Sequence, residues 1–315
     1  MSYKTPSNLY KYLSFNENTM ECLISHTAYY SDPSQFNDPL DCKPVVVVDV
    51  SLDVLEKVAC QLIRMKSEKE LSSMTKRFKF NDSESERKIS SLSESDVLSF
   101  LKDVNYYSNE NEDLEPYNYK KYRYQQAIQE EIVSVFRKGV WCLSSKYDSP
   151  LMWSHYANNH KGICIEYDMS DVDDGVAKKI IYGGSRNLKV SLIEQWLDTG
   201  KMPNEIEDVC MLTKSRDWRY ESEWRLFGKI GVEGIEPSMK SVIFGMNCKE
   251  TTIALIINAF LGFRREIKFW KISNIGDGFK LKRHRVDEEE YMQHYSNILT
   301  YGEIKKIFGD SDPFP

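Results

Sequence analysis

Two glutamates separated by a single residue are the side chains of this sequence best suited to catalysis. Glu221 and Glu223 lie in the segment DWRYESEWR at 217–225. If this segment is a β-strand, residues i and i+2 face the same side, so the two carboxylates repel and one pKa rises. One interpretation is a carboxylate pair in a cleft, which binds a sugar hydroxyl or steers a nucleophile. The alternative is a solvated row of ion pairs with Arg219 and Arg225, which share the alternation.

A second group of reactive side chains lies in residues 142–168. Ser144 and Ser145 follow an expected strand, but the GxSxG elbow of a nucleophilic serine is absent. They are therefore expected either to donate hydrogen bonds to a ligand or to cap a turn. His155 is interpreted either as a ligand-contacting acid or base, or as a packed histidine. Trp153 and Tyr156 are the aromatic side chains beside it.

No metal site is expected. His155 and His160 are five residues apart, whereas a zinc-binding pair on a helix needs a spacing of four. The seven cysteines are an odd number without a CxxC pair, which favours free thiols in a reducing cytosol over disulfides or structural zinc. Cys142, between Trp141 and Leu143, is expected to be a buried and inert thiol.

Composition excludes several classes of protein. The 315 residues are 41% hydrophobic and 29% charged, as in an ordinary globular protein. A net charge of -6 gives no bulk indication of a nucleic-acid or anionic-membrane partner. No apolar run reaches 18 residues and no signal peptide is evident, so a cytoplasmic protein with no membrane partner is expected.

The elements that must position these side chains are strands interrupted by helices without regular alternation, which favours an α+β fold. We expect a single domain over 1–315, with a split, mostly antiparallel β-sheet core from residues 1–50 and 139–285. The segment 51–138 has helical periodicity and is interpreted as a helical insertion. A C-terminal helix and tail are expected over 287–315.

Five short motifs resemble an uncharacterised bacterial family, the domain-of-unknown-function family 2971. The matching segments are spread over roughly residues 8–245 and leave the expected helical insertion and the tail uncovered. They are Leu9-Tyr10-Lys11-Tyr12, Phe36-Asn37-Asp38-Pro39, Leu151-Met152-Trp153-Ser154-His155-Tyr156-Ala157, His160-Lys161-Gly162-Ile163-Cys164-Ile165 and Tyr220-Glu221-Ser222-Glu223-Trp224-Arg225.

The order of the motifs also resembles the arginine–serine–glutamate class of ADP-ribosyltransferases. In that class an early strand carries a basic residue, a later strand carries serines, and a third carries an ExE motif. The counterparts here are Lys11 in the LYKY segment, Ser144-Ser145, and Glu221-Ser222-Glu223. This sequence has no arginine at the first position and lacks the threonine between the serines.

That resemblance implies a fold like that of the ADP-ribosyltransferases and NAD as the substrate that is consumed. Glu223 would orient the ribose 2′-hydroxyl and stabilise developing positive charge, while Glu221 would assist the acceptor. The residues that the resemblance implies in cofactor binding are Tyr10, Lys11, Tyr30, Ser144, Ser145, Trp153 and Tyr156.

The resemblance further implies a protein or nucleic-acid acceptor and a role as a bacterial toxin or anti-phage defence effector. Two other functions stay open. Aromatic and basic residues interleaved in 218–225 and in 268–285 are typical of a protein that binds or processes nucleic acid. A non-catalytic binding module is the third possibility.

Overall fold

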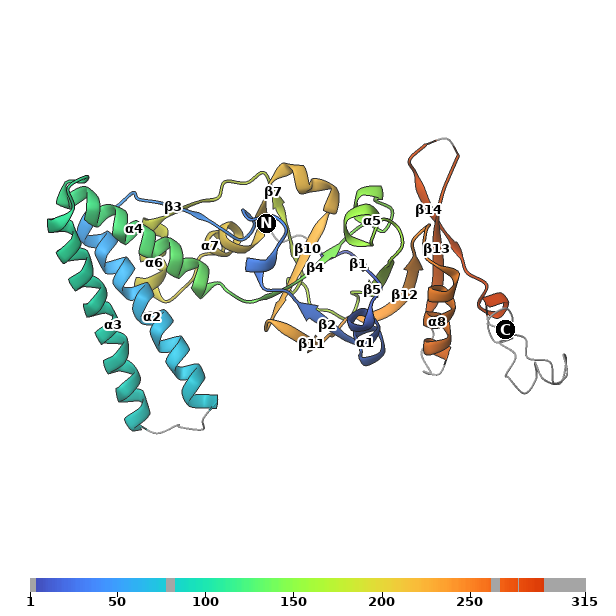
Figure 1. Cartoon of the computed structure of the whole chain (residues 1–315), viewed down its shortest axis with the longest axis horizontal. Coiled ribbons are helices and arrows are strands. Elements are labelled where there is room, and N and C mark those ends of the chain that lie inside the picture. The colour runs from blue at the N-terminus through green and yellow to red at the C-terminus, as the bar shows by residue number, and fades with distance from the viewer. Residues whose placement is uncertain (1–3, 78–82, 262–266, 277, 292–315) are drawn as a thin grey trace, which may run out of the picture.

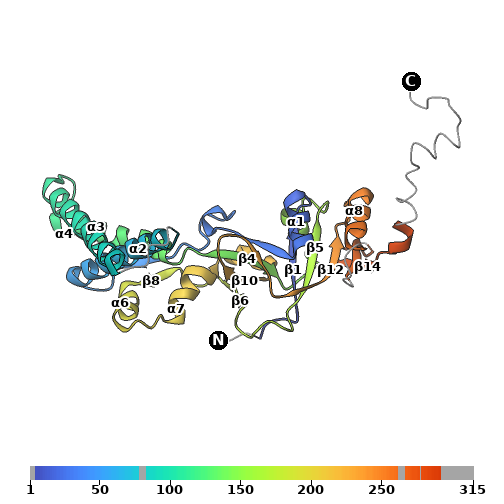
Figure 2. The ribbon, with the colours of Figure 1, turned by 90° about the horizontal axis from the view of Figure 1, so that it is seen from below.

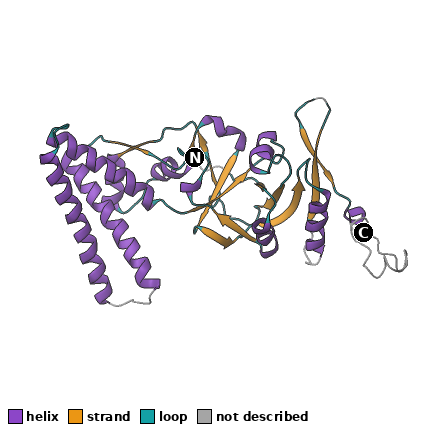
Figure 3. Cartoon of the chain, in the orientation of Figure 1, coloured by secondary structure: helices purple, strands orange, loops and turns teal. Residues whose placement is uncertain are grey.

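An eight-stranded sheet forms the centre of the protein, and long helices extend from one end of it (Figures 1 and 3). The computed structural model describes residues 4–77, 83–261, 267–276 and 278–291. Seen from below, the helical end and the sheet lie one after the other along the long axis (Figure 2). None of the described helices is long and apolar enough to cross a membrane.

The main sheet is mixed and mostly antiparallel, with the order β14-β13-β12-β5-β1-β4-β10-β6. Only the β12–β13 pair among these neighbours is parallel. Its strands are β1 (Asn8–Leu13), β4 (Gly139–Ser144), β5 (Ile163–Asp168), β6 (Lys178–Lys179), β10 (Glu223–Gly228), β12 (Ser238–Phe244), β13 (Lys268–Asn274) and β14 (Leu281–Arg285).

Three two-stranded sheets accompany the main one. They pair β11 with β2, β3 with β8, and β7 with β9. Their strands are β2 (Thr27–Tyr30), β3 (Val45–Val47), β7 (Ile181–Tyr182), β8 (Asn187–Lys189), β9 (Thr213–Lys214) and β11 (Gly231–Gly234).

The helices differ greatly in length. Three long ones follow each other between β3 and β4: α2 (Leu52–Arg77), α3 (Ser83–Glu110) and α4 (Pro116–Val135). The others are α1 (Glu17–Ser25), α5 (Pro150–Tyr156), α6 (Val190–Thr199), α7 (Asn204–Glu207) and α8 (Glu250–Leu261), with the 3-10 helices η1 (Pro33–Gln35) and η3 (Arg216–Glu221) and the π-helical turn η2 (Asp208–Leu212).

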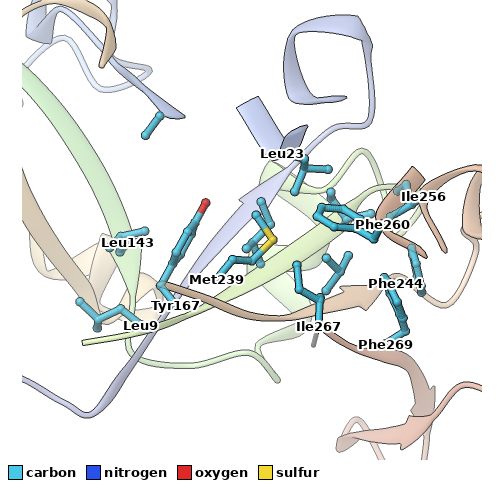
Figure 4. Packing of buried hydrophobic residues seen from close by; sticks show 14 of the residues in the cluster. Leu9, Leu23, Leu143, Tyr167, Met239, Phe244, Ile256, Phe260, Ile267 and Phe269 are labelled. Atoms are coloured by element: carbon cyan, nitrogen blue, oxygen red, sulfur yellow. The ribbon is translucent and has the colours of Figure 1, made fainter. Parts of the chain in front are cut away.

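Each face of the main sheet is covered by its own hydrophobic core. Leu9 of β1 packs with Leu23 of α1 and Phe260 of α8 on one face (Figure 4). On the other face, Tyr10 and Tyr12 pack with Trp153 of α5 and its neighbours. The alternation of β1 therefore serves two cores, as expected for a central strand covered on both faces.

The sheet opens between β1 and β4. These strands are paired at a single position, Tyr10 opposite Ser144. By contrast, β1 pairs with β5 over six positions, and β4 pairs with β10 over six. Among the described residues the ladder between the two strands stops after this pair, and the Cys142 carbonyl of β4 accepts a hydrogen bond from the Lys11 side chain instead.

The α+β class and the mostly antiparallel sheet agree with the sequence predictions. Asn16 caps α1, because its Oδ1 accepts a hydrogen bond of 2.9 Å from Thr19 N. Gly200 ends α6 in the left-handed conformation. The polar stretch 66–96 has a composition compatible with either a loop or solvated helices. It is helical wherever it is described.

The sequence has strand character at 45–50 and at 178–182, but neither run forms one continuous strand in the structure. The run 45–50 is strand only at Val45–Val47, and Val45 is exposed rather than buried. The run 178–182 forms two separate short strands, because Lys178–Lys179 pairs with β10 and Ile181–Tyr182 with β9. Most of the expected C-terminal helix and tail, residues 292–315, lies outside the described residues.

Candidate functional site

A cavity of about 320 Å³ lies where the sheet opens. It receives side chains from β1, β4, α5, η3, β10 and the loop around η1. Its walls are formed by Tyr10, Lys11, Tyr12, Ser31, Gln35, Phe36, Asn37, Asp38, Asp41, Cys142, Leu143, Ser144, Met152, Tyr156, Lys214, Trp218, Glu221, Glu223 and Arg225. Neighbouring residues of β1 point to opposite faces of a sheet, yet Tyr10, Lys11 and Tyr12 all line the cavity, so it lies against the edge of that strand.

Three sequence motifs meet in one row across the sheet. Tyr10 of β1 is opposite Ser144 of β4, and Ser144 is opposite Glu223 of β10. All three residues line the cavity. Segments that are far apart in the sequence therefore contribute adjacent side chains at this edge.

Glu221 and Glu223 do converge, but not as alternate residues of one strand. Glu221 ends the 3-10 helix η3, and β10 begins only at Glu223. Ser222 between them has φ 48° and ψ 47°, the left-handed conformation. This turn brings both carboxylates to the same lysine, whereas Arg219, expected on the same face, is exposed and away from the pair.

Lys214 of β9 joins the two carboxylates. Its Nζ lies 2.6 Å from Glu221 Oε2, 2.9 Å from Glu223 Oε2 and 3.4 Å from Asp41 Oδ2. The other oxygen of Glu221 accepts a hydrogen bond of 2.5 Å from the Tyr156 hydroxyl. Every carboxylate oxygen of Glu221 therefore already has a partner, and the lysine is nearly buried.

Arg225 holds Glu223 from the opposite side and has no exposed surface. Its Nε donates to Glu223 Oε1 at 2.7 Å, and its Nη2 donates to Asp41 Oδ2 at 2.6 Å. Its Nη1 donates to the main-chain carbonyl of Met211 at 2.7 Å. The expected neutralisation by Arg225 is thus present for Glu223, while Lys214 takes the place expected of Arg219.

The environment pushes the two glutamate pKa values apart. Burial, and next the Glu223 carboxylate, raise the pKa of Glu221 above its ordinary value. Burial alone would raise the pKa of Glu223 as well, but Arg225 and Lys214 hold it well below its ordinary value. Two carboxyls with opposite shifts are the arrangement from which separate acid, base and charge-stabilising roles arise.

The serines hold the ExE segment by its main chain. Ser144 Oγ donates to the Glu221 carbonyl at 2.6 Å. The amide N of Ser145 donates to the Ser222 carbonyl at 3.0 Å, and its Oγ to the same carbonyl at 3.3 Å. Both serines therefore fix the left-handed turn, and their hydroxyl protons face that segment rather than the cavity.

Lys11 bridges the opening in the sheet. Its Nζ donates to the Cys142 carbonyl of β4 at 2.9 Å. No carboxylate of the described residues forms an ion pair with it, unlike Lys214 and Arg225, the other two cations of the cavity wall. Lys11 is therefore the lining cation whose charge is available to an anionic ligand.

The loop that carries Phe36 and Asp38 closes one side of the cavity. It is tied down by Trp218, whose Nε1 donates to Asp38 Oδ2 at 2.8 Å. Asp38 Oδ1 also accepts a hydrogen bond of 2.8 Å from Leu40 N, which is an Asx-turn. Phe36, Asp38 and Trp218 all line the cavity.

Four residues that the sequence assigned to the site lie outside the cavity wall. Tyr30 is buried beside Trp141 in the core on the other side of β4. Trp153 is fully buried against Tyr12. Ser145 bonds the main chain as described, and His155 is exposed beside Tyr220.

Two residues of the charge cluster were not found from the sequence. Asp41 lies in an irregular loop, and Lys214 belongs to a two-residue strand. Neither position has a periodic pattern around it. Only their burial beside Glu223 and Arg225 identifies them.

The structure also bears on metal binding and on the reactivity of the Cys142 thiol. Among the described residues, no three His, Cys, Asp or Glu side chains gather where they could hold a metal ion. Burial raises the pKa of the Cys142 thiol well above its ordinary value, so this cysteine stays protonated and is a poor nucleophile.

The opposite pKa shifts predict opposite effects of pH on stability. A carboxyl whose pKa is raised by folding stabilises the fold fully below its unfolded pKa of about 4.5, and this contribution is lost as the pH rises through the folded value. Glu221→Gln removes that loss. The free energy of unfolding of Glu221→Gln relative to wild type should therefore increase between pH 4.5 and pH 8, as measured by urea denaturation at each pH.

Glu166→Gln is the matched control for that trend, because Glu166 is also buried but is held by Ser241, Arg283 and Tyr10 rather than by Lys214. Burial alone would raise the pKa of Glu166, but these hydrogen bonds and Arg283 lower it, so its contribution is present above pH 4.5 and is lost only as the pH falls below it. Its difference from wild type should stay level between pH 5 and pH 8. A level difference for Glu221→Gln as well would show that the pKa of Glu221 is not raised.

Comparison with known proteins identifies one family. The model of a protein family of unknown function, DUF2971, matches residues 152–226, from α5 into β10. No curated protein and no solved structure matches the chain, so the resemblance to ADP-ribosyltransferases stays a prediction. The matched segment contains Tyr156, Lys214, Glu221, Glu223 and Arg225, all of which line the cavity. Residues 152–226 are thus recognised as a domain of the DUF2971 family, whose function is unknown.

Proposed function

We propose that this protein is an NAD-consuming enzyme of the ADP-ribosyltransferase or NAD-glycohydrolase type. The observation that carries the proposal is the row formed by Tyr10, Ser144 and Glu223 on three adjacent strands beside one cavity. Ser144 and Glu223 are residues that the resemblance assigns to the serine and glutamate motifs. Tyr10 precedes Lys11, the counterpart of the basic residue, which also lines the cavity. The resemblance rests on the order of the motifs in the sequence, so the adjacency of these residues in the sheet supports the proposal independently.

The reaction breaks the bond between the ribose C1′ and the nicotinamide nitrogen of NAD. The bonding electrons leave with nicotinamide, which becomes neutral, and positive charge develops at C1′ and the ring oxygen. Glu223 is suited to stabilise that charge because Arg225 and Lys214 keep it ionised. Water or an acceptor then adds to C1′ and loses a proton, which gives ADP-ribose or the ribosylated acceptor.

Glu221 is suited to take that proton. The pKa of Glu221 is raised above that of an ordinary glutamate and so lies closer to neutral pH, which is favourable for a general base. Its hydrogen bonds with Tyr156 and Lys214 fix the carboxylate in one orientation. Proton transfer to a positioned group is worth about 10²- to 10⁴-fold in rate.

The remaining walls suit the other parts of a dinucleotide. Tyr10, Tyr12, Phe36 and Trp218 offer aromatic faces for a ring. Lys11 offers a positive charge to the pyrophosphate. A cavity of about 320 Å³ holds part of NAD, with the remainder extending from its mouth.

The acceptor is proposed only as a class. If the acceptor is a protein or a nucleic acid, the enzyme is a transferase; if the acceptor is water, it is a glycohydrolase. The biological role we propose is that of a bacterial toxin or anti-phage effector, because the enzyme would either consume NAD or transfer the ADP-ribose group from it.

The test is release of nicotinamide from NAD by the purified protein, followed by chromatography, with and without cell extract as a source of acceptor. NADH is the matched control, because its reduced ring carries no positive charge and is a poor leaving group. We expect release from NAD and none from NADH. Failure to bind NAD at millimolar concentration, with no turnover in any extract, would contradict the proposal.

A further inference from the structure

The hairpin of β13 and β14 carries a charge pattern unlike the rest of the chain. Residues 278–285, GFKLKRHR, contain four cations (Lys280, Lys282, Arg283 and Arg285) and no carboxylate, in a protein of net charge -6. β14 is the last strand of the sheet, so one of its edges is unpaired. Figure 1 shows the hairpin extending clear of its neighbours.

The cations of β14 are divided between two faces. Arg283 and Arg285 have partners, since Arg283 Nη1 lies 2.8 Å from Glu166 and Arg285 Nη2 lies 2.5 Å from Glu288. The alternate residues Lys280, Lys282 and His284 are exposed. Within the described residues no ion pair holds either lysine. Alternate strand residues are about 6.8 Å apart, so these three form a regular row.

An exposed aromatic side chain lies next to Lys280 at the turn of the hairpin. Phe279 is 92% exposed, and Ile275, across the hairpin, is 49% exposed. The main chain beside them is paired, because Ile275 N donates to the Lys280 carbonyl at 3.1 Å. Lysines on an edge strand alone are explained as protection against pairing with other chains. An exposed phenylalanine at the same edge has the opposite effect, so protection does not explain the whole pattern.

We propose that this hairpin, residues 275–285 with residue 277 left aside, binds single-stranded nucleic acid. The regular row of Lys280, Lys282 and His284 suits a regularly spaced phosphate backbone, and Phe279 offers a face on which a base stacks. This surface is separate from the cavity, none of whose lining residues it contains. Its test does not depend on NAD chemistry.

The experiment titrates the full chain into a fluorescein-labelled 20-nucleotide poly-dT strand and follows anisotropy. Two or three phosphate contacts predict that affinity falls about ten-fold between 50 and 200 mM salt. Lys280→Glu combined with Lys282→Glu should weaken binding at least ten-fold and flatten the salt dependence. Phe279→Ala should weaken it about five-fold or more, because stacking is lost.

Matched variants separate the hairpin from the charge of the whole protein. Lys201→Glu with Lys229→Glu changes the net charge equally on exposed lysines elsewhere, and Tyr106→Ala removes an exposed aromatic from α3. Both should bind within two-fold of wild type. All these variants alter exposed side chains, and unchanged thermal melting verifies the fold.

Four outcomes would overturn the proposal. The first is no binding by wild type at 50 mM salt. The second is equal weakening by the hairpin pair and the control pair. The third is full binding by Phe279→Ala, and the fourth is competition by polyglutamate as strong as by unlabelled poly-dT. In the last two cases the surface would recognise charge alone.

Discussion

Glu223→Gln is expected to lower the rate of nicotinamide release from NAD by at least about 100-fold. Replacing a charged group that stabilises a transition state typically costs 10²- to 10³-fold in kcat. The amide has the shape of the carboxylate but cannot neutralise positive charge at the ribose. The measurement is steady-state nicotinamide release by both proteins at saturating NAD.

The control for that variant is Glu131→Gln. Glu131 is also buried and paired with a lysine, but it lies on α4 and does not line the cavity. It should release nicotinamide at the wild-type rate. Near-ultraviolet circular dichroism and NAD affinity show whether Glu223→Gln retains the folded site. An intact Glu223→Gln protein with wild-type turnover would exclude Glu223 from the chemistry.

Arg225→Met should have the largest effect on stability, a loss of about 3–5 kcal/mol in the free energy of unfolding. The guanidinium is fully buried and bonds Glu223, Asp41 and the Met211 carbonyl. Methionine fills part of the volume but leaves both carboxylates with Lys214 as their only cation. Urea denaturation at pH 7 measures the difference.

Arg225→Lys and Arg219→Met test the origin of that loss. Lysine retains the charge but not the planar fork of donors, so it should cost less than methionine but still more than 1 kcal/mol. Arg219 is exposed, and Arg219→Met should stay within about 0.5 kcal/mol of wild type. If Arg225→Met unfolds like Arg219→Met, the buried cluster does not hold the fold together.

Local structure was largely readable from the sequence, because local rules determine it. Asn16 and Gly200 mark helix ends through groups that lie within one turn of them. Pro150 at the first turn of α5 and Ser149 at its N-cap follow the same rule. The ExE, serine and LYKY motifs were recognisable because each is a short contiguous string.

The residues that lie next to those motifs in the folded protein could not be predicted from local rules. The strand order that places β4 between β1 and β10 is a choice among distant segments. The left-handed Ser222 breaks the alternation on which the carboxylate pair was predicted, and glycine, the usual residue for that conformation, is absent there. Lys214 and Asp41 matter only because tertiary packing buries them beside Glu223. Tyr30 and Trp153 were assigned to the cofactor site through the resemblance, but both side chains pack in hydrophobic cores.

The central position of β1 has a consequence for synthesis of the chain. β1 is made first, yet its neighbours β4 and β5 follow only after 125 intervening residues, 14–138. At 5–20 residues per second, the ribosome needs about 6–25 s to deliver the first of them. Meanwhile α2, α3 and α4 can pair with one another, while β1 presents two unpaired edges and apolar side chains on both faces. Chaperone binding to the nascent chain is therefore expected to concentrate on residues 8–13 until β4 and β5 emerge.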